Sequence, residues 1–498
     1  MRTIGHFIDG TRRAGTSGRM APVYDPSTGA VQAEVALADE AEVAAAVESA
    51  RVAQRGWAAQ NPQRRSRVLT KFIELVEAEA DELAVLLSSE HGKTVADSHG
   101  DIQRGLEVAE FCAGIPHLLK GEHTEGAGTG IDVHSVRQPL GVTVGITPFN
   151  FPAMIPLWQA APSLACGNAM VLKPSERDPS VPLRLAELFL EAGLPPGVLN
   201  VINGDGVAAN ALMADPRVAS LSFVGSSDLA HHVYRTAAEH GKRAQCFGGA
   251  KNHLVVLPDA DLDLVVDGLL GAAYGSAGER CMAVSVAVPV GEAVADELVG
   301  RLTERVAKLT MGLPTDPSAD FGPLVSGAAK QRVLDYIDVG IAEGAELVVD
   351  GRGVGVAGHE DGFFVGGCLF DHVTPEMRIY REEIFGPVLS VVRAADYEEA
   401  LRLPTEHEYG NGVSIFTRDG AAARDFAARV GVGMVGINVP IPVPVGYHSF
   451  GGWKRSGFGD LNQYGSDSIK FNTRAKLVTT RWGSSGDGSS AFVIPTMD

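Results

Sequence analysis

The spacing of apolar and polar residues changes several times along the chain, and each spacing predicts a different kind of element. Residues 1–40 read as short extended pieces separated by turns such as 25–29, where proline and glycine interrupt regular backbone. Apolar residues then recur at helical spacing, with charged residues on the opposite face. This pattern predicts amphipathic helices at 40–60, 64–90 and 107–119.

Between residues 142 and 247, strand-like segments alternate with helical ones. The predicted strands are 142–146, 169–173, 198–202, 219–224 and 243–247, and the predicted helices are 154–165, 180–193, 206–215 and 227–240. This alternation predicts an α/β fold with a doubly wound parallel sheet, and ligands of such a sheet bind at the carboxyl ends of its strands.

The second half of the chain continues the α/β alternation from residue 255 to about residue 438. The pattern predicts helices at 259–274 and 294–309 and strands at 284–288 and 388–393. Two further segments, 131–138 and 468–479, alternate in the manner of strands. The end of the chain from residue 483 is rich in glycine and serine and is predicted to be loose.

Composition and charge narrow the function. A chain of 498 residues exceeds what one core usually supports, so two or more domains are expected. The net charge of −19 argues against a nucleic-acid partner, so an anionic ligand must be met by local cations. The N-terminus lacks the apolar core of a signal peptide, and no apolar run is long enough to span a bilayer. We therefore expect a soluble protein without membrane insertion.

The cysteines indicate a reducing compartment. They are five in number, widely spaced and without a C-x-x-C pair, so neither a disulfide framework nor a zinc cage is predicted. No H-E-x-x-H or P-loop motif occurs, and we assign no metal. These observations predict a cytoplasmic protein with Cys112, Cys166, Cys246, Cys281 and Cys368 as free thiols.

Cys281 is the candidate nucleophile. It follows the small-residue stretch 271–278, which lets the backbone approach a ligand closely, and it precedes the predicted strand 284–288. A buried free cysteine that serves only packing is about as common, so this stretch alone leaves both interpretations open.

Polar residues at the ends of two predicted strands are candidates for ligand binding. The loop 147–152 ends a predicted strand and contains Asn150. The amide of Asn150 can donate a hydrogen bond to an oxyanion or cap a turn. Lys173 and Glu176 end the next strand, where a ribose and its phosphates would lie. A carboxylate at this place favours NAD over NADP.

Two further motifs have both a functional and an ordinary interpretation. Gly225 and Ser226 end a later strand at the start of a helix, where free N–H groups can face a phosphate or form a simple N-cap. Glu383 and Phe385 stand before a Gly-Pro turn, either at a site or on the surface. A formal G-x-G-x-x-G at 431–436 follows a helical segment rather than a strand, so we interpret it as a turn.

Taken together and in this order, these residues resemble the NAD(P)-dependent aldehyde dehydrogenase superfamily over nearly the whole chain. The segments 247–253, 278–283 and 439–444 are similar to its CoA-acylating semialdehyde dehydrogenase branch. The resemblance implies an NAD-binding domain at 1–123 and 142–248, a catalytic domain at 249–445, and a β oligomerisation arm at 124–141 and 462–482. It also implies a loose tail at 483–498 and assembly as a homodimer or homotetramer.

The same resemblance implies a role for each matching residue. Cys281 matches the nucleophile and Asn150 the oxyanion donor. The other implied roles are cofactor binding by Thr147, Phe149, Lys173, Glu176, Gly225, Ser226, Glu383 and Phe385, and binding of the substrate carboxylate by Arg104 and Arg280. Within these roles Lys173 and Glu383 are the ribose-binding pair. The two arginines could instead pair with acidic side chains such as Glu107 and Glu279.

Two positions depart from the family pattern. Phe247 stands where hydrolytic members carry a glutamate that activates water, and phenylalanine cannot take a proton. Ala230 stands where many members have a glycine, which leaves the close approach of a phosphate open.

The resemblance implies NAD-dependent oxidation of methylmalonate or malonate semialdehyde through a Cys281 thioester. Coenzyme A then takes the acyl group, giving propionyl-CoA or acetyl-CoA with loss of CO2 or bicarbonate. The alternatives are a non-acylating aldehyde dehydrogenase that releases the free acid, and a non-catalytic scaffold with the same fold. A cysteine hydrolase is less favoured, because no histidine is placed by local signature to activate Cys281.

Overall fold

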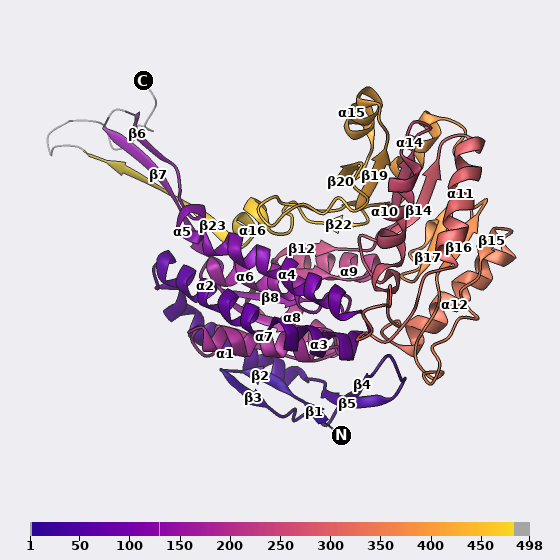
Figure 1. Cartoon of the computed structure of the whole chain (residues 1–498). Coiled ribbons are helices and arrows are strands. Elements are labelled where there is room, and N and C mark those ends of the chain that lie inside the picture. Colours follow the sequence, from indigo (N-terminus) through magenta and orange to yellow (C-terminus); the bar gives the residue numbers. More distant parts are fainter. Residues whose placement is uncertain (1, 129, 483–498) are drawn as a thin grey trace.

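The computed structural model describes residues 2–128 and 130–482 and contains two large sheets with helices packed around them (Figure 1). The predicted loose tail from residue 483 lies outside the described residues. The fold is of mixed α/β class, as the sequence predicts. Among the described residues, no helix combines the length and the apolar character that crossing a membrane requires.

The first large sheet has eight strands in the order β22-β12-β11-β8-β9-β10-β2-β3. Its five central strands are parallel and are the five that the sequence predicts. β8 and β9 are buried along their whole length, as expected for strands covered on both faces. The strands are β2 (His6–Ile8), β3 (Thr11–Arg13), β8 (Val142–Ile146), β9 (Ala169–Lys173), β10 (Leu199–Val201), β11 (Val218–Val224), β12 (Arg243–Phe247) and β22 (Gly457–Phe458).

Four predicted helices connect these strands, and the strand order places the ligand crevice. The chain runs from β8 to β9 and β10 on one side, then returns to the other side of β8 for β11 and β12. The order therefore reverses between β8 and β11, which is where ligands bind in open α/β sheets. The connecting helices are α6 (Met154–Ala165), α7 (Ser180–Glu191), α8 (Gly206–Ala214) and α9 (Ser227–Glu239).

The N-terminal helices differ in part from the prediction. The predicted helix 64–90 is two helices, because Glu79 ends one and begins the next. The helix predicted at 107–119 begins earlier, at Val95, where the Thr94 side chain accepts a hydrogen bond from the backbone N–H of Asp97. The helices are α1 (Glu40–Ala58), α2 (Pro62–Ala78), α3 (Ala80–His91), α4 (Val95–Ala113) and α5 (Ile115–Leu118).

A three-stranded antiparallel sheet extends away from the body as an arm (Figure 1). It consists of β6 (His123–Gly128), β7 (Ile131–Pro139) and β23 (Thr473–Arg481). The predicted strand at 468–479 is wrong in its first part, which forms α16 (Gly465–Phe471). Ile469 and Phe471 are both buried on this short helix, so the alternation of apolar and polar residues here does not mark a strand. A further small sheet near the N-terminus consists of β1 (Arg2–Ile4), β4 (Met20–Tyr24) and β5 (Val31–Ala36).

The second large sheet has seven strands in the order β15-β16-β17-β14-β13-β19-β20. All neighbours are parallel except β15 and β16. The strands are β13 (Asn252–Val256), β14 (Val284–Pro289), β15 (Glu346–Val349), β16 (Cys368–Asp371), β17 (Val388–Val391), β19 (Gly412–Phe416) and β20 (Met434–Ile437). The helices and short strands of this half are α10 (Leu262–Tyr274), α11 (Glu292–Val306), α12 (Gly327–Ala342), α13 (Arg378–Arg381), α14 (Tyr397–Glu406), α15 (Gly420–Arg429), β18 (Tyr409–Gly410) and β21 (Trp453–Lys454).

The glycine motif at 431–436 joins α15 to β20, so the strand–glycine–helix order of a dinucleotide fingerprint is absent, as predicted. The turn that we predicted for the whole motif ends at Gly433, because β20 begins at Met434.

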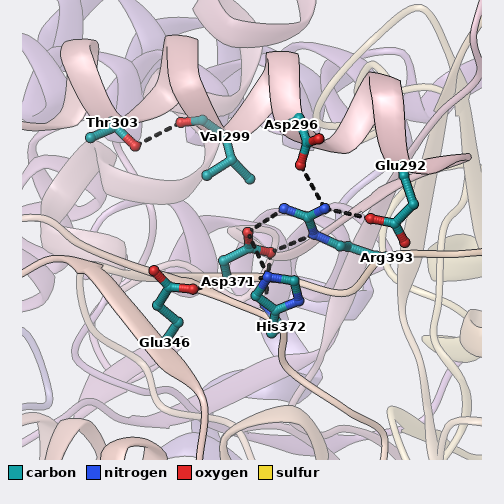
Figure 2. Close-up of polar contacts among 8 residues, drawn as sticks. All are labelled: Glu292, Asp296, Val299, Thr303, Glu346, Asp371, His372 and Arg393. Carbon is teal, nitrogen blue, oxygen red and sulfur yellow. Dashed lines mark hydrogen bonds and ion pairs between the residues drawn. The ribbon is translucent and has the colours of Figure 1, made fainter.

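Charged side chains gather along the carboxyl ends of the parallel strands of the seven-stranded sheet, where β16 and β17 end and α11 begins (Figure 2). We call each line of strand ends an edge of the sheet. Arg393 donates hydrogen bonds to Asp371 at 2.7 Å, to Glu292 at 2.6 Å and to Asp296 at 2.8 Å. These bonds tie α11 to the sheet. His372 follows Asp371 with a φ of 53°, and its Nε2 lies 3.9 Å from a carboxylate oxygen of Glu346. We call Arg393, Asp371, Glu292 and Asp296 the Arg393 cluster.

Candidate active site

Cys281 lies at the opposite edge of the same sheet, just before β14 begins. A tight turn at Gly275–Gly278 follows α10, and Ser276, Ala277 and Gly278 have φ values of 53°, 51° and 72°. A Cβ at Gly278 would come within 2.2 Å of the Gly386 carbonyl oxygen, so only glycine allows this approach. The small-residue stretch thus brings the nucleophile segment against the loop that carries Glu383.

Two asparagines hold the backbone of Cys281. The Nδ2 of Asn252 donates to the Cys281 carbonyl at 2.9 Å, and the Nδ2 of Asn411 donates to the same carbonyl at 3.1 Å. Asn252 also accepts a hydrogen bond from the Gly412 N–H at 3.0 Å. Neither side chain was predicted to hold Cys281, because Asn252 begins β13 and Asn411 lies just before β19, both distant from Cys281 in the sequence.

The environment of the Cys281 thiol favours its protonated form. Burial, and then the nearby Glu383 carboxylate, raises the pKa of Cys281 to about 12, although the backbone N–H groups of Cys281 and Met282 and the Arg280 charge oppose the shift. Cys281 is half-buried, whereas the other four cysteines are buried. A pocket joins Cys281 to Glu383 and Phe385 and is also lined by Ala250 and Asn252.

Glu383 points into this pocket. Its Oε1 accepts a hydrogen bond from the Ala250 N–H at 2.9 Å, and burial raises the pKa of the carboxyl. In the described part of the chain no hydrogen bond or ion pair joins Glu383 to Lys173, the other member of the predicted ribose-binding pair. The structure therefore places Glu383 beside Cys281.

Lys173 and Glu176 lie together at the carboxyl end of β9. The Lys173 ammonium donates to the carbonyls of Pro174 at 2.8 Å and Gly204 at 2.6 Å, and it lies 3.8 Å from the Glu176 carboxylate. Burial lowers the pKa of Lys173, while Glu176 raises it. Glu176 remains 37% exposed, so its carboxylate can meet a ligand in the crevice.

The loop after β8 brings Thr147, Phe149 and Asn150 to the same crevice. The Phe149 ring packs edge-on against Phe385 with 5.8 Å between centroids, which joins the loops of the two large sheets. Asn150 is buried, and its carbonyl accepts a hydrogen bond from the Lys93 ammonium at 2.6 Å. The Thr147 N–H donates to the Lys173 carbonyl at 3.1 Å. Lys93 gave no sequence signal, because its role depends on tertiary contacts.

Ser226 takes the N-cap position of α9 with extended backbone, and no cap hydrogen bond of its side chain is found among the described residues. Gly225 and Ser226 are the two residues between the end of β11 and the start of α9. The neighbouring Ser227 is engaged, since its hydroxyl accepts from the Gly249 N–H at 2.9 Å. Ala230 is fully buried on α9.

The two predicted carboxylate-binding arginines each have an acidic partner. Arg104 donates to Glu107 at 2.5 Å and to the Pro444 carbonyl at 2.7 Å. Arg280 donates to Asp97 at 2.5 Å. Arg104 thus pairs with Glu107, the acidic residue that the sequence offered as its alternative partner.

For Arg280 the acidic partner is Asp97 where Glu279 was suggested. Glu279 is buried elsewhere and accepts from the Val325 N–H at 3.2 Å. Burial raises the pKa of Glu279 to about 8.

Phe247 ends β12 in an aromatic environment. Its ring lies 6.4 Å from that of Phe450, which packs on Trp158 and Tyr464 at centroid distances of 5.4 and 4.9 Å. Burial raises the pKa of the Tyr464 hydroxyl, and Cys281 adds a smaller contribution in the same direction. Phe247 therefore lies beside a cluster of aromatic rings.

The loops of the two large sheets meet beside the pocket that Cys281 and Glu383 line, so the chain is a mixed α/β protein with a pocket where the two sheets meet. Residues 13–478 match the sequence model of the Aldehyde dehydrogenase family, and the chain belongs to this family. It is 54% identical over 498 residues to a malonate-semialdehyde dehydrogenase of Pseudomonas aeruginosa, with all of both chains covered. It is 46% identical over 481 residues to malonate-semialdehyde dehydrogenase 3 of Geobacillus kaustophilus, covering 97% of this chain and 99% of that one.

Solved structures agree with this assignment. A Sinorhizobium meliloti protein crystallised in complex with NAD is 64% identical and superposes with a TM-score of 0.97, covering 97% of this chain and 99% of that one. The methylmalonate-semialdehyde dehydrogenase of Oceanimonas doudoroffii is 54% identical with a TM-score of 0.96, covering 98% and 99%.

Proposed function

We propose that the protein is an NAD-dependent, CoA-acylating dehydrogenase of methylmalonate or malonate semialdehyde. Relatives at 54% and 46% identity are named malonate-semialdehyde dehydrogenases, and a similar structure is named a methylmalonate-semialdehyde dehydrogenase. Cys281 is the nucleophile of this proposal, with Asn150 as the oxyanion donor.

The residues of the crevice fit a nicotinamide dinucleotide. Glu176 is partly exposed beside Lys173 and can accept hydrogen bonds from ribose hydroxyls, while its charge would repel a 2′-phosphate and so favours NAD over NADP. Ser226 and the start of α9 offer hydroxyl and N–H donors for a diphosphate. When bound, the cofactor accepts the hydride that the aldehyde carbon loses. Glu383, Phe385, Thr147 and Phe149 complete the proposed cofactor site.

Cys281 carries the covalent chemistry. The Cys281 thiol first loses its proton to solvent, which the nearby Arg280 charge favours. The thiolate attacks the aldehyde carbon, and the resulting alkoxide is stabilised by the Asn150 amide and the Cys281 backbone N–H. The alkoxide carbon gives up its hydride, which leaves a thioester on the Cys281 sulfur. The bond from the α-carbon to the β-carboxylate then breaks and releases CO2, which water converts to bicarbonate, and the electron pair left on the α-carbon takes up a proton. The CoA thiol then attacks the acyl carbon, its sulfur replaces the Cys281 sulfur, and Cys281 leaves as a thiolate. The products are propionyl-CoA or acetyl-CoA.

Phe247 is the observation that carries the acylating part of the proposal. It lies in an apolar environment beside Phe450, where a water molecule finds no base. Glu383 does contribute a carboxylate to the pocket, and its Oε1 accepts from the Ala250 N–H. In this proposal the Glu383 carboxylate binds the nicotinamide ribose. A thiol is intrinsically more nucleophilic than water and is partly ionised near neutral pH, so CoA can resolve a thioester that water attacks slowly.

The experiment that tests the function follows NADH after mixing enzyme, NAD and malonate semialdehyde. Without CoA we expect a burst of about one NADH per subunit and then a slow phase, because acyl-enzyme accumulates. Addition of CoA should restore steady turnover and give acyl-CoA in the mass spectrum. A fast linear rate without any thiol, with free acid as product, would establish the non-acylating alternative.

Arg104 and Arg280 are the proposed partners of the substrate carboxylate. Both guanidinium groups already engage carboxylates, Glu107 and Asp97, so a substrate carboxylate can replace or join these partners. We expect Arg104→Leu to lower kcat/KM for malonate semialdehyde by about tenfold or more, with a much smaller effect on propanal, which has no carboxylate. Equal effects on the two aldehydes would assign Arg104 a structural role with Glu107.

The division of the chain into NAD-binding, catalytic and arm regions remains part of the proposal, as does assembly with further copies. Leu477 on β23 is 71% exposed and Val136 on β7 is also exposed. An apolar surface on an extended β arm is suited to packing against a second copy of the chain.

A further inference from the structure

The turn between β12 and β13 holds the Glu383 carboxylate. We call Gly249 and Ala250 of this turn the Glu383 seat. The Ala250 N–H donates to the Glu383 Oε1 at 2.9 Å. A Cβ added to Gly249 would come within 2.5 Å of the Glu383 Oε2, so a side chain at this position would displace the carboxylate. Gly249 and Ala250 therefore determine where the Glu383 side chain can lie.

Lys251, the next residue of the turn, holds the main chain that leads to Glu383. Its ammonium donates to the Ile379 carbonyl at 2.6 Å and to the Glu382 carbonyl at 2.9 Å. Both carbonyls belong to the end of α13, directly before Glu383. Lys251 is only 3% exposed. Removal of its side chain would leave two buried carbonyls without a donor.

Other contacts hold this segment from its outer side. Arg332 on α12 donates to the Glu383 carbonyl, and the Tyr336 hydroxyl donates to the Glu382 carboxylate at 2.7 Å. Both donors come from the same helix, α12. Lys251 is the anchor on the inner side, next to the pocket of Cys281.

The role of Lys251 depends on hydrogen-bond donation rather than on charge alone. Burial lowers the pKa of Lys251 to about 7, and the Glu383 and Glu382 carboxylates oppose this shift. An amine and an ammonium can both donate two hydrogen bonds, so the anchor persists on either side of neutral pH. A methionine of similar length keeps the apolar stem and removes the donors.

We propose that Lys251 is a positioning residue, whose two hydrogen bonds fix the main chain of 379–382 so that the Glu383 carboxylate is presented to the cofactor. This inference rests on the proposed function, in which Glu383 binds the nicotinamide ribose. Lys251 then acts through Glu383, without touching cofactor or substrate. A purely structural lysine would affect stability without regard to the residue at 383.

A double-mutant cycle tests this coupling. The variants are Lys251→Met, Glu383→Gln and the pair, and the measurements are the Kd of NAD and the rate of the NADH burst. We expect Lys251→Met to weaken one or both by about tenfold to a hundredfold when Glu383 is present, because small misplacements at a reacting centre have effects of this size. In the Glu383→Gln background, the same substitution should change them by about twofold or less.

Lys454 provides the matched control. Its ammonium donates to the carbonyls of Pro404, Thr405 and His407 at 3.0, 2.7 and 3.0 Å, away from Glu383. Lys454→Met should have the same effect on both measurements in either background. An equal effect of Lys251→Met in the two backgrounds would overturn the proposal, as would an unchanged Kd and burst rate.

A second variant keeps the test decisive if Lys251→Met does not fold. Gly249→Ala crowds the Glu383 carboxylate and leaves the Lys251 anchor in place, so it should also slow the burst while thermal unfolding stays cooperative. A normal burst in Gly249→Ala would show that the seat does not matter. Failure of the proposed function looks different, because the wild-type chain would then form no NADH with the semialdehyde or would form it independently of CoA.

Discussion

The two edges of the seven-stranded sheet hold their charged groups in opposite ways. At the Cys281 edge, burial moves pKa values toward the neutral forms, raising that of Glu383 and lowering that of Lys251 to about 7. At the other edge, Arg393 is surrounded by three carboxylates, and its hydrogen bond to Asp371 leads the effects that raise its pKa. At one edge of the sheet burial thus favours the uncharged forms of the side chains, and at the other edge the ion pairs favour the charged form of Arg393.

Backbone conformation follows the same division. Three consecutive residues before Cys281, Ser276, Ala277 and Gly278, have left-handed backbone, whereas the Arg393 cluster has one such neighbour, His372. Strained backbone and perturbed carboxyl, amine and thiol groups occur together where chemistry is performed. Groups that satisfy one another, as around Arg393, fix the position of a helix. The difference supports the proposal that the Cys281 edge carries the reaction, while the Arg393 edge contributes to stability.

The largest expected effect separates Cys281 from a structural cysteine. Cys281→Ala should lower kcat by on the order of 10⁴-fold or more with little change in NAD affinity, because no other group in the pocket can form the thioester. Cys368, buried on β16, is the control, and Cys368→Ala should retain turnover. Steady-state NADH assays and NAD titrations measure both. Substantial turnover by Cys281→Ala would refute the assignment of the nucleophile.

The next effect concerns the reactivity of the thiol with pH. The pKa of Cys281 is raised to about 12, so the reactive thiolate is scarce at neutral pH and grows as pH rises. Iodoacetamide should therefore alkylate Cys281 in the cofactor-free enzyme about tenfold faster for each unit between pH 7 and 10.

Glu383→Gln sharpens this measurement. The Glu383 carboxylate contributes to the raised pKa of Cys281, so its neutralisation should lower that pKa and increase alkylation at a fixed pH. Peptide mass analysis identifies the labelled thiol. A rate that levels off by pH 9 would show that the thiol has an ordinary pKa, and the contrast between the two edges would weaken.

Substitution of Arg393 should change the stability of the protein and leave its activity unchanged. Arg393→Met leaves the buried Asp371 carboxylate without its cation, which should lower the free energy of unfolding by about 1–3 kcal/mol. Glu292 and Asp296 are exposed and contribute less. Thermal and urea unfolding measure the loss, and the NADH burst at 25 °C should be unchanged. Arg418, paired with Asp261 on the surface, is the control, and Arg418→Met should cost about 0.5 kcal/mol or less.

A slowed burst in Arg393→Met would mean that the two edges are coupled. The sheet between them is buried, so such coupling would have to pass through β14 or β17, which link the cluster to the Cys281 and Glu383 loops.

How well the sequence predicted an element depended on whether its buried positions are apolar. β8 and β9 of the first sheet were recognisable because strands buried on both faces are nearly continuous apolar runs. The start of α4 was not, because its buried face includes Ser98, Asp101 and Gly105 in place of apolar residues. Asp101 is acceptable there because it pairs with Lys93 and accepts the Met154 N–H. Such compensation is invisible in hydrophobic spacing.

The candidate site shows the same limit. The sequence indicated Cys281 through its small neighbours, and family resemblance indicated Asn150 and Glu383. The contacts that orient these groups join distant residues, such as Lys251 to Ile379 and Asn411 to Cys281. Glu383 was predicted as a partner of Cys281, but the contact that positions its carboxylate was not, because it depends on the absence of a side chain at Gly249.

The smallest expected effect tests the single left-handed residue beside the Arg393 cluster. His372 has a φ of 53°, a conformation that β-branched residues adopt at a cost of about 1–2 kcal/mol and that asparagine tolerates. His372→Val should therefore lower the free energy of unfolding by about 1 kcal/mol, while His372→Asn should stay within about 0.5 kcal/mol of the wild type. Both variants lose the 3.9 Å contact with Glu346. That contact is more than half exposed on both sides and is screened, so its loss alone should be small. Equal destabilisation by valine and asparagine in urea unfolding would assign the cost to the lost contact, and the backbone at this edge would then carry no strain comparable to that before Cys281.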